Sequence, residues 1–157
     1  MKRFKIISNN PLVAENHHRL LTGSSFLEQN REKFQLDFQP ETVQQVFSRA
    51  EKLLKSGWKL TTHPLPASGG LIGSPCRTLI MEEVESQFCR LEEEDLQVLK
   101  EAARRWQESR GEIISQNSSE ELKAYRQLDL WSLESALQEI EKFISKSGGA
   151  NSEAGSW

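Results

Sequence analysis

Short segments in the first half of the chain show the spacing of β-strands. Residues 33–38 alternate between polar and apolar side chains, which is typical of a half-buried strand. Residues 3–7, 58–62 and 77–81 are similarly short and contain β-branched, aromatic and aliphatic side chains. The sequence therefore predicts four strands, all of them before residue 82.

Two helices are predicted between these strands. Asn10 is a favoured N-cap and Pro11 a favoured first helical residue, so one helix should begin near Pro11 and end at Gly23. Over residues 43–54 the apolar side chains recur at steps of three and four, which is the clearest helical stripe in the chain. We expect Pro40 to lie in the first turn of this second helix.

The rest of the chain has a helical pattern. The spacing of apolar residues predicts one helix over about 92–109 and another from 118 to about 146, with a break at Gly111. Residues 147–157 are rich in Gly, Ser and Ala and are expected to form a disordered tail. We therefore expect a single α/β domain over residues 1–146.

The order strand, helix, strand, helix, strand is that of a doubly wound α/β sheet with parallel strands and right-handed crossovers. The loop over 63–75 leads to the fourth strand and contains three prolines and three glycines, so it holds no helix. It is barely long enough for a parallel crossover, and the fourth strand should pair antiparallel beside the third. The predicted fold is an α/β three-layer sandwich with a small, mostly parallel four-stranded sheet and additional C-terminal helices.

Composition and charge exclude several classes of function. The chain has 157 residues, 36% of them hydrophobic and 27% charged, as in an ordinary soluble domain. No apolar run approaches the roughly 20 residues that span a bilayer, and the start is too short for a secretory signal. We expect a cytoplasmic protein without a membrane partner. Residues 1–81 hold 11 Lys and Arg against 6 Asp and Glu, but these bases are scattered, so no nucleic-acid partner is expected.

Cysteine and histidine are too few to suggest a metal or a redox framework. Cys76 and Cys89 are the two cysteines, and the chain has three histidines. No nucleotide-binding glycine motif occurs either. We therefore expect neither a metal nor another cofactor.

The topology predicts where a ligand would bind. In open α/β sheets, ligands bind beyond the carboxyl ends of the strands. The residues after the first strand and the loop after the third reach that edge, and an antiparallel fourth strand would bring its first residue there. The positive end of the helix at Pro11 would point into the same space, which favours a carboxylate or a phosphate. The predicted ligand-binding residues are Asn9, Asn10, His63, Ser68 and Arg77.

These residues also have structural interpretations. Asn10 is fully explained as a helix cap, and Arg77 either forks onto a carboxylate ligand or caps a sheet edge. His63 either exchanges a proton near neutral pH or holds its loop in place through a backbone carbonyl. Arg77 beside Cys76 would lower the pKa of that thiol, but no partnered nucleophile and base is visible. The catalytic residues therefore stay unknown, with His63 as the candidate.

Two segments carry a family resemblance. Ile6-Ile7-Ser8-Asn9-Asn10-Pro11-Leu12-Val13 and Thr62-His63-Pro64-Leu65 resemble motifs of the GrdX family, and the resemblance covers roughly residues 3 to 145. That family comprises small bacterial proteins encoded beside glycine, sarcosine and betaine reductase components. The chain keeps Ser68, Pro75 and Arg77, but it has Gly70-Leu71-Ile72 in place of a Lys-Pro-Asn segment and Cys76 in place of an aromatic residue. The resemblance implies a divergent member, an accessory protein of reductive amino-acid metabolism with a reductase component as partner.

Three hypotheses about function follow. The first is an accessory protein that binds a small carboxylate or phosphate at the C-terminal edge of the sheet. The second is a small hydrolase or transferase that uses His63 as acid or base. The third is an interaction module that docks through its C-terminal helices, which would require one exposed patch formed by Trp131, Leu133, Leu137 and Phe143. The oligomeric state stays open.

Overall fold

The computed structural model describes residues 2–64, 71–84, 89–116 and 119–154, with side chains described over 2–64, 71–84, 93–109 and 119–146. The strands are β1 (Phe4–Ser8), β2 (Phe34–Phe38), β3 (Trp58–Leu60) and β4 (Thr78–Glu83). The helices are α1 (Pro11–Leu21), α2 (Ser25–Gln29), α3 (Val43–Leu54), α4 (Cys89–Gln116) and α5 (Ser119–Ala154), with a 3-10 turn, η1 (Arg31–Lys33), before β2. Within the described residues, no helix has the length and apolar character needed to cross a bilayer.

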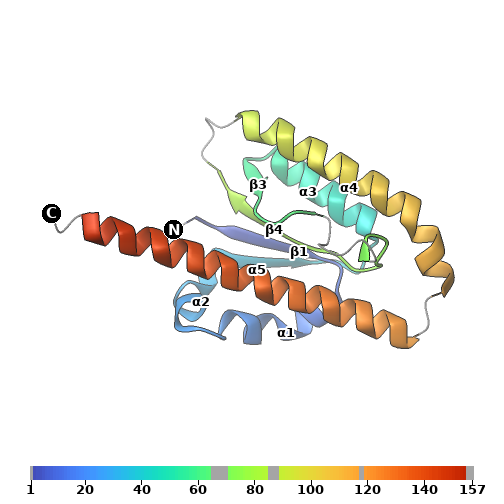
Figure 1. Cartoon of the computed structure of the whole chain (residues 1–157), viewed down its shortest axis with the longest axis horizontal. Coiled ribbons are helices and arrows are strands. Elements are labelled where there is room, and N and C mark those ends of the chain that lie inside the picture. Colours follow the sequence, from blue (N-terminus) through green and yellow to red (C-terminus); the bar gives the residue numbers. More distant parts are fainter. Residues whose placement is uncertain (1, 65–70, 85–88, 117–118, 155–157) are drawn as a thin grey trace.

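The four strands form one sheet in the order β2-β1-β4-β3 (Figure 1). β1 pairs parallel with β2, whereas β4 pairs antiparallel with both β1 and β3. The prediction of an antiparallel β4 beside β3 is confirmed, but the prediction of a mostly parallel sheet is wrong, because two of the three pairings are antiparallel. The reason is that β4 takes the position between β1 and β3, where its consecutive apolar residues Leu79, Ile80 and Met81 are all buried.

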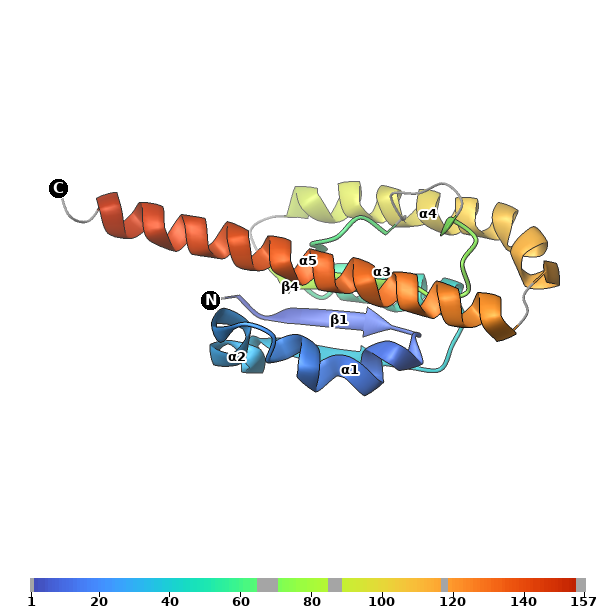
Figure 2. The same cartoon turned by 60° about the horizontal axis from the view of Figure 1, so that its bottom comes forward.

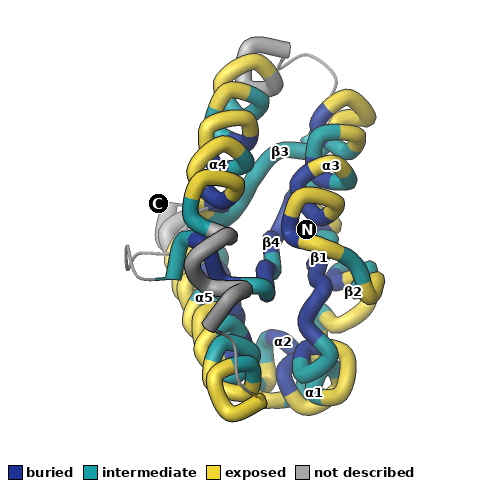
Figure 3. The backbone as a smooth tube through the Cα atoms, turned by 90° about the vertical axis from the view of Figure 1, so that its right-hand side faces the viewer, coloured by how far each residue is buried: buried dark blue, intermediate teal, exposed yellow. Residues whose placement is uncertain are grey.

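Helices cover both faces of this sheet. α1, α2 and α5 lie on one face, and α3 and α4 lie on the other (Figures 1 and 2). Successive residues of β4 point to opposite faces, so Ile80 joins the core under α5 while Leu79 and Met81 join the core under α3 and α4. The outer sides of the long helices are exposed, as Figure 3 shows. Both faces of β4 are therefore buried in hydrophobic cores.

Local capping sets where the first helices begin. The side chain of Asn10 accepts a hydrogen bond of 3.1 Å from the backbone N–H of Leu12, with Pro11 as the first helical residue, as predicted. α3 instead begins after Thr42, which forms a capping box with Gln45. Pro40 therefore lies ahead of α3 and not in its first turn.

The two C-terminal helices are longer than predicted. α4 continues through Gly111 to Gln116, because one glycine costs a helix only about 1 kcal/mol relative to alanine. α5 extends to Ala154, beyond the predicted end near residue 146. Since the side chains of 147–157 lie outside those described, the disordered tail stays a prediction.

Candidate functional site

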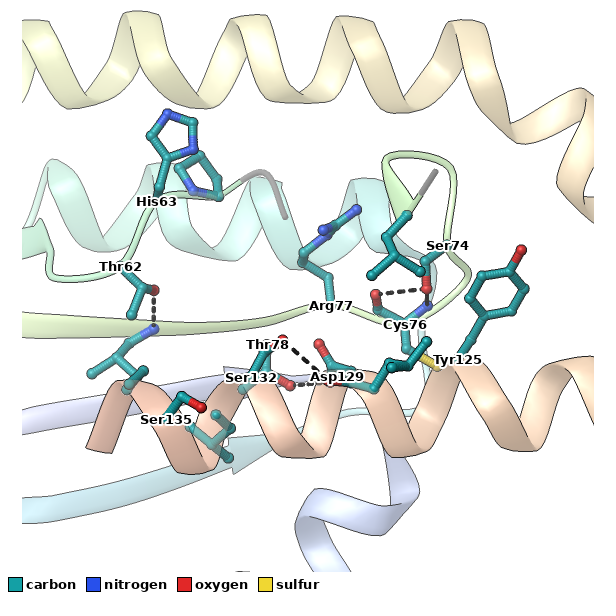
Figure 4. A pocket seen from close by; sticks show the side chains of 16 residues that line it. Thr62, His63, Ser74, Cys76, Arg77, Thr78, Tyr125, Asp129, Ser132 and Ser135 are labelled. Carbon is teal, nitrogen blue, oxygen red and sulfur yellow. Dashed lines mark hydrogen bonds between the residues drawn. The ribbon is translucent and has the colours of Figure 1, made fainter. Parts of the chain in front are cut away.

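A cavity of about 330 Å³ lies between α5, the start of β4 and two segments of the connection from β3 to β4, residues 61–64 and 71–77 (Figure 4). β3 ends at Leu60, and the next residues fold against β4 as a loop. The backbone N–H groups of Thr61 and Thr62 donate to the carbonyl of Ile80 at 2.9 and 3.4 Å, and the Thr62 hydroxyl accepts from the Ile80 N–H at 3.1 Å. β3 is short and pairs only with residues 81–83 of β4. Among the strands that the structure describes, none therefore lies beside the beginning of β4 on that edge, and the β4 residues Thr78 and Ile80 line the cavity.

Ten of the sixteen residues that line the cavity have polar or titratable side chains, although apolar atoms form most of its exposed surface. Its hydroxyl groups come from the β3–β4 connection, from β4 and from α5, and they belong to Thr62, Ser74, Thr78, Tyr125, Ser132 and Ser135. Its titratable side chains are His63, Cys76, Arg77 and Asp129. Among the described residues, no group of His, Cys, Asp and Glu has the arrangement to hold a metal ion. This lining suits hydrogen bonding to a small polar or charged molecule.

Arg77 is a buried cation whose hydrogen bonds are incomplete. The residue is 6% exposed, and its Nη2 donates to the carbonyl of Ile72 at 3.0 Å. Its Nε is buried with no hydrogen-bond partner among the described residues. Burial lowers the pKa of Arg77, while the charge of Asp129 acts in the opposite direction. An arginine stays protonated even so, which leaves a buried positive charge beside the cavity.

Asp129 is the carboxylate that lines the cavity from α5. One carboxylate oxygen, Oδ2, accepts hydrogen bonds from the Thr78 hydroxyl at 2.6 Å and from the Asn10 side-chain amide at 2.9 Å. Burial raises the pKa of Asp129, and the hydrogen bonds from Thr78 and Asn10 and the charge of Arg77 oppose that rise. Thr78 and Arg77 are adjacent, so their side chains point to opposite sides of the strand. Figure 4 accordingly shows Arg77 and Asp129 on opposite sides of β4.

The two predicted asparagines lie behind the cavity and not in its lining. The Asn9 side chain donates to the carbonyls of Glu41 and Pro75 at 2.9 and 3.0 Å and accepts from the Arg77 backbone N–H at 2.8 Å. The fully buried Asn10 caps α1 through its oxygen and donates to the Arg126 carbonyl at 2.8 Å and to Asp129. Both Nδ2 donors of each amide are thus used within the protein. These asparagines hold the walls in place, and the cap interpretation of Asn10 is confirmed.

His63 and Arg77 are the predicted site residues that the structure brings to this cavity. His63 is exposed to solvent, at the end of the loop that follows β3. Ser68 lies outside the described residues. The predicted group of five therefore divides into two lining residues, two supporting residues and one that the structure does not describe.

Cys76 does not have the activated thiol that its neighbour suggested. The side chain is 4% exposed, and burial, followed by the charge of Asp129, raises the pKa of the thiol to about 11. The charge of Arg77 does lower this pKa, as expected, but its effect is smaller than that of burial, so the thiol is not activated. Cys76 is a neutral thiol at physiological pH.

A second cavity, of about 680 Å³, adjoins the first along α5. It shares Thr62, His63 and Ala136 with the first. Four of its eight other lining residues are apolar, and they give it a mainly apolar surface. The apolar side chains are Phe4, Ile140, Phe143 and Ile144, and the charged ones are Lys2, Glu82 and Glu139. We refer to this second cavity as the apolar groove.

The exposed patch required for the interaction module is not present as predicted. Trp131 and Phe143 are 54% and 74% exposed, but Leu133 and Leu137 are 3% and 1% exposed and pack against the sheet. The four residues therefore form no continuous surface, because they lie on different sides of α5.

The side chains that α5 contributes to the cavity are not among the ligand-binding residues predicted from the sequence. Asp129 stands between Leu128 and Leu130 in a helix whose buried face is apolar, and a lone acidic residue in such a context was the available signal. Tyr125, Ser132 and Ser135 carry no comparable signal, since polar residues on a long helix are usually solvated.

No curated protein and no solved structure matches this chain. The family model described as GrdX-like protein matches residues 5–138. This range includes β1 except for Phe4, the other three strands, the connection from β3 to β4 and the part of α5 that lines the cavity. The chain therefore belongs to the GrdX-like protein family.

Proposed function

We propose that this protein is a cytoplasmic accessory protein that binds a small carboxylate or phosphate in the cavity between β4 and α5. One observation carries the proposal, namely the buried guanidinium of Arg77, whose Nε has no partner among the described residues. Buried charged groups are normally paired and hydrogen-bonded, and an anionic ligand in the cavity that Arg77 lines would supply the missing counter-charge. A volume of about 330 Å³ is within the range of small-molecule sites.

The arrangement of charge supports an anion at Arg77. Asp129 is held by Thr78 and Asn10 and lies on the other side of β4, so it does not occupy the guanidinium. Cys76 is neutral because of its raised pKa. The surrounding hydroxyl groups offer further donors to a carboxylate or phosphate oxygen.

Family membership supports the accessory role. The chain belongs to the GrdX-like family, and the resemblance at residues 6–13 and 62–65 implies a link to reductive amino-acid metabolism. On this proposal, the ligand would be a small carboxylate or acyl phosphate of that metabolism, and a reductase component would be the protein partner.

Calorimetric titration with glycine, sarcosine, betaine, acetyl phosphate and phosphate tests the proposal. We expect at least one of these to bind the wild type and to bind Arg77→Met at least tenfold more weakly, since a charge-assisted fork is lost. Arg105→Met replaces an exposed arginine on α4 and should leave binding unchanged. Arg77→Lys keeps the positive charge but loses the two parallel hydrogen bonds of a guanidinium. It serves as a second variant in case Arg77→Met does not fold, and circular dichroism checks the fold of each variant. Absence of heat with every ligand and the wild type would reject the proposal.

A hydrolase or transferase that uses His63 as acid or base is the second candidate. It is favoured by the position of His63, which is exposed to solvent and lines the same cavity as Arg77. If a reaction is found, full activity in His63→Ala would reject this candidate while leaving anion binding untouched.

A further inference from the structure

The polar cavity and the apolar groove are neighbours with a common boundary. Thr62, His63 and Ala136 line both, so a molecule seated at Arg77 has the groove directly beside it. From Tyr125 to Ile144, the α5 residues that line the two spaces span about 28 Å, at 1.5 Å per residue. The groove is also the larger of the two, at about 680 Å³ against about 330 Å³. A ligand that filled only the first space would leave most of this apolar surface uncovered.

We infer that the ligand is an amphiphile, with an anionic head at Arg77 and a linear aliphatic tail along the apolar groove. This inference rests on the proposed function, because it assigns a ligand class to the same site. The walls of the groove suit such a tail. Phe4 and Ile140 are 4% and 8% exposed and form part of the core under α5, and Ile144 packs against that core.

The charges around the groove are already matched within the protein. Glu82 pairs with Lys2 at 3.6 Å and with Lys59 at 3.5 Å, and Glu139 pairs with Lys142 at 3.8 Å. Binding in the groove therefore does not require a second charged group on the ligand. In contrast, Arg77 lines only the first cavity, and its buried Nε has no hydrogen-bond partner in the described part of the chain. This difference between the polar cavity and the apolar groove assigns the head and the tail.

The test is a series of straight-chain carboxylates, from acetate to decanoate, titrated into the full chain below their critical micelle concentrations. Burying one methylene group is worth about a fourfold gain in affinity. We therefore expect the Kd to fall roughly twofold to fourfold for each added methylene until the groove is filled. Octyl phosphate would distinguish a phosphate head from a carboxylate head, and octylamine should bind weakly because it carries the wrong charge.

Variants at the boundary and in the groove separate the head from the tail. Ala136→Leu narrows the passage, and Ile144→Ser makes the groove wall polar. Both should weaken octanoate at least fivefold, and Ile144→Ser, which lies outside the first cavity, should leave acetate unchanged. Ala124→Leu is the matched control, because Ala124 is exposed on α5 and lines neither space. Arg77→Met should weaken every carboxylate in the series.

The failure of this inference differs from the failure of the proposed function. If acetate or phosphate binds through Arg77 but chain length has no effect, the amphiphile is rejected and the anion site stands. If sedimentation also shows a dimer that Ile144→Ser dissociates, the groove is an interface between copies, and the inference is equally overturned. If no anion of any length binds, the proposed function fails together with the inference.

Discussion

At the scale of single residues, the neighbourhood of the cavity holds a carboxylate and a guanidinium in different environments. Asp129 has two hydrogen-bond donors on one oxygen, whereas Arg77 has an Nε without an acceptor among the described residues. Removing water from a charge is costly unless other groups replace it. Asp129 is thus supported by the fold itself, and Arg77 is the residue whose environment a ligand would complete.

The raised pKa of Asp129 makes a prediction about stability and pH. Because the pKa in the folded state lies above 3.8, the folded protein binds this proton more tightly than the unfolded chain. The contribution of Asp129 to stability must therefore fall as the pH rises from 3.8 through the folded-state pKa. Asp129→Asn keeps an oxygen for both donors and removes this dependence. Its free energy of unfolding, minus that of the wild type, should increase between pH 4 and pH 7 in urea titrations.

Asp129→Ala serves as the comparison for that prediction. It leaves the Thr78 hydroxyl and the Asn10 amide without their acceptor and should cost about 2 to 4 kcal/mol at neutral pH. A difference between Asp129→Asn and the wild type that stays constant with pH would contradict the titration argument.

At the scale of elements, Asn10 joins the start of α1 to the first third of α5. Its oxygen caps α1, and its Nδ2 donates to Arg126 and Asp129 on α5. α5 is the last helix in the chain, and α1 is the first. One side chain therefore fixes the position of a cavity wall relative to the sheet edge.

Substitutions of Asn10 can separate its two tasks. Asn10→Ala loses the cap and both bonds to α5 and should destabilise the protein by about 3 kcal/mol, as measured by urea unfolding. Asn10→Ser retains a capping oxygen and should recover about 1 kcal/mol. Thr42→Ala removes only the exposed cap of α3 and should cost about 1 kcal/mol. Equal losses for Asn10→Ala and Thr42→Ala would mean that the bonds to α5 contribute nothing.

Local signals made part of this arrangement predictable. The Asn10 cap, the start of α1 and the stripe of α3 depend on residues within a few positions of one another, and the sequence alone reveals them. The central position of β4 depends on competition among strands for a buried site. The role of Asp129 depends on partners 51 and 119 residues away. Such contacts leave no periodic trace in the sequence, which is why α5 was absent from the predicted site.

At the scale of the whole molecule, β4 links two cores. Its alternating residues contribute to the core under α5 and to the core under α3 and α4. Unfolding of either core would therefore remove the packing on one face of β4. We therefore expect the two faces of the sheet to unfold together.

Two substitutions on opposite faces test this coupling. Leu137 on α5 and Leu54 on α3 are 1% and 2% exposed. Leu137→Ala and Leu54→Ala should each cost about 2 to 5 kcal/mol. In both variants, circular dichroism and tryptophan fluorescence should follow one common transition. Two separate transitions in either variant would show that the cores unfold independently.

The order of elements along the chain has a consequence for biosynthesis. All four strands lie between Phe4 and Glu83, whereas the α5 residues that complete the cavity begin at Tyr125. A ribosome therefore makes every strand of the sheet before it makes Asp129, and the core around Ile6 and Ile80 lacks the side chains of α5 until that helix is translated. Strand pairing can thus begin during synthesis, while the cavity between β4 and α5 still lacks one wall.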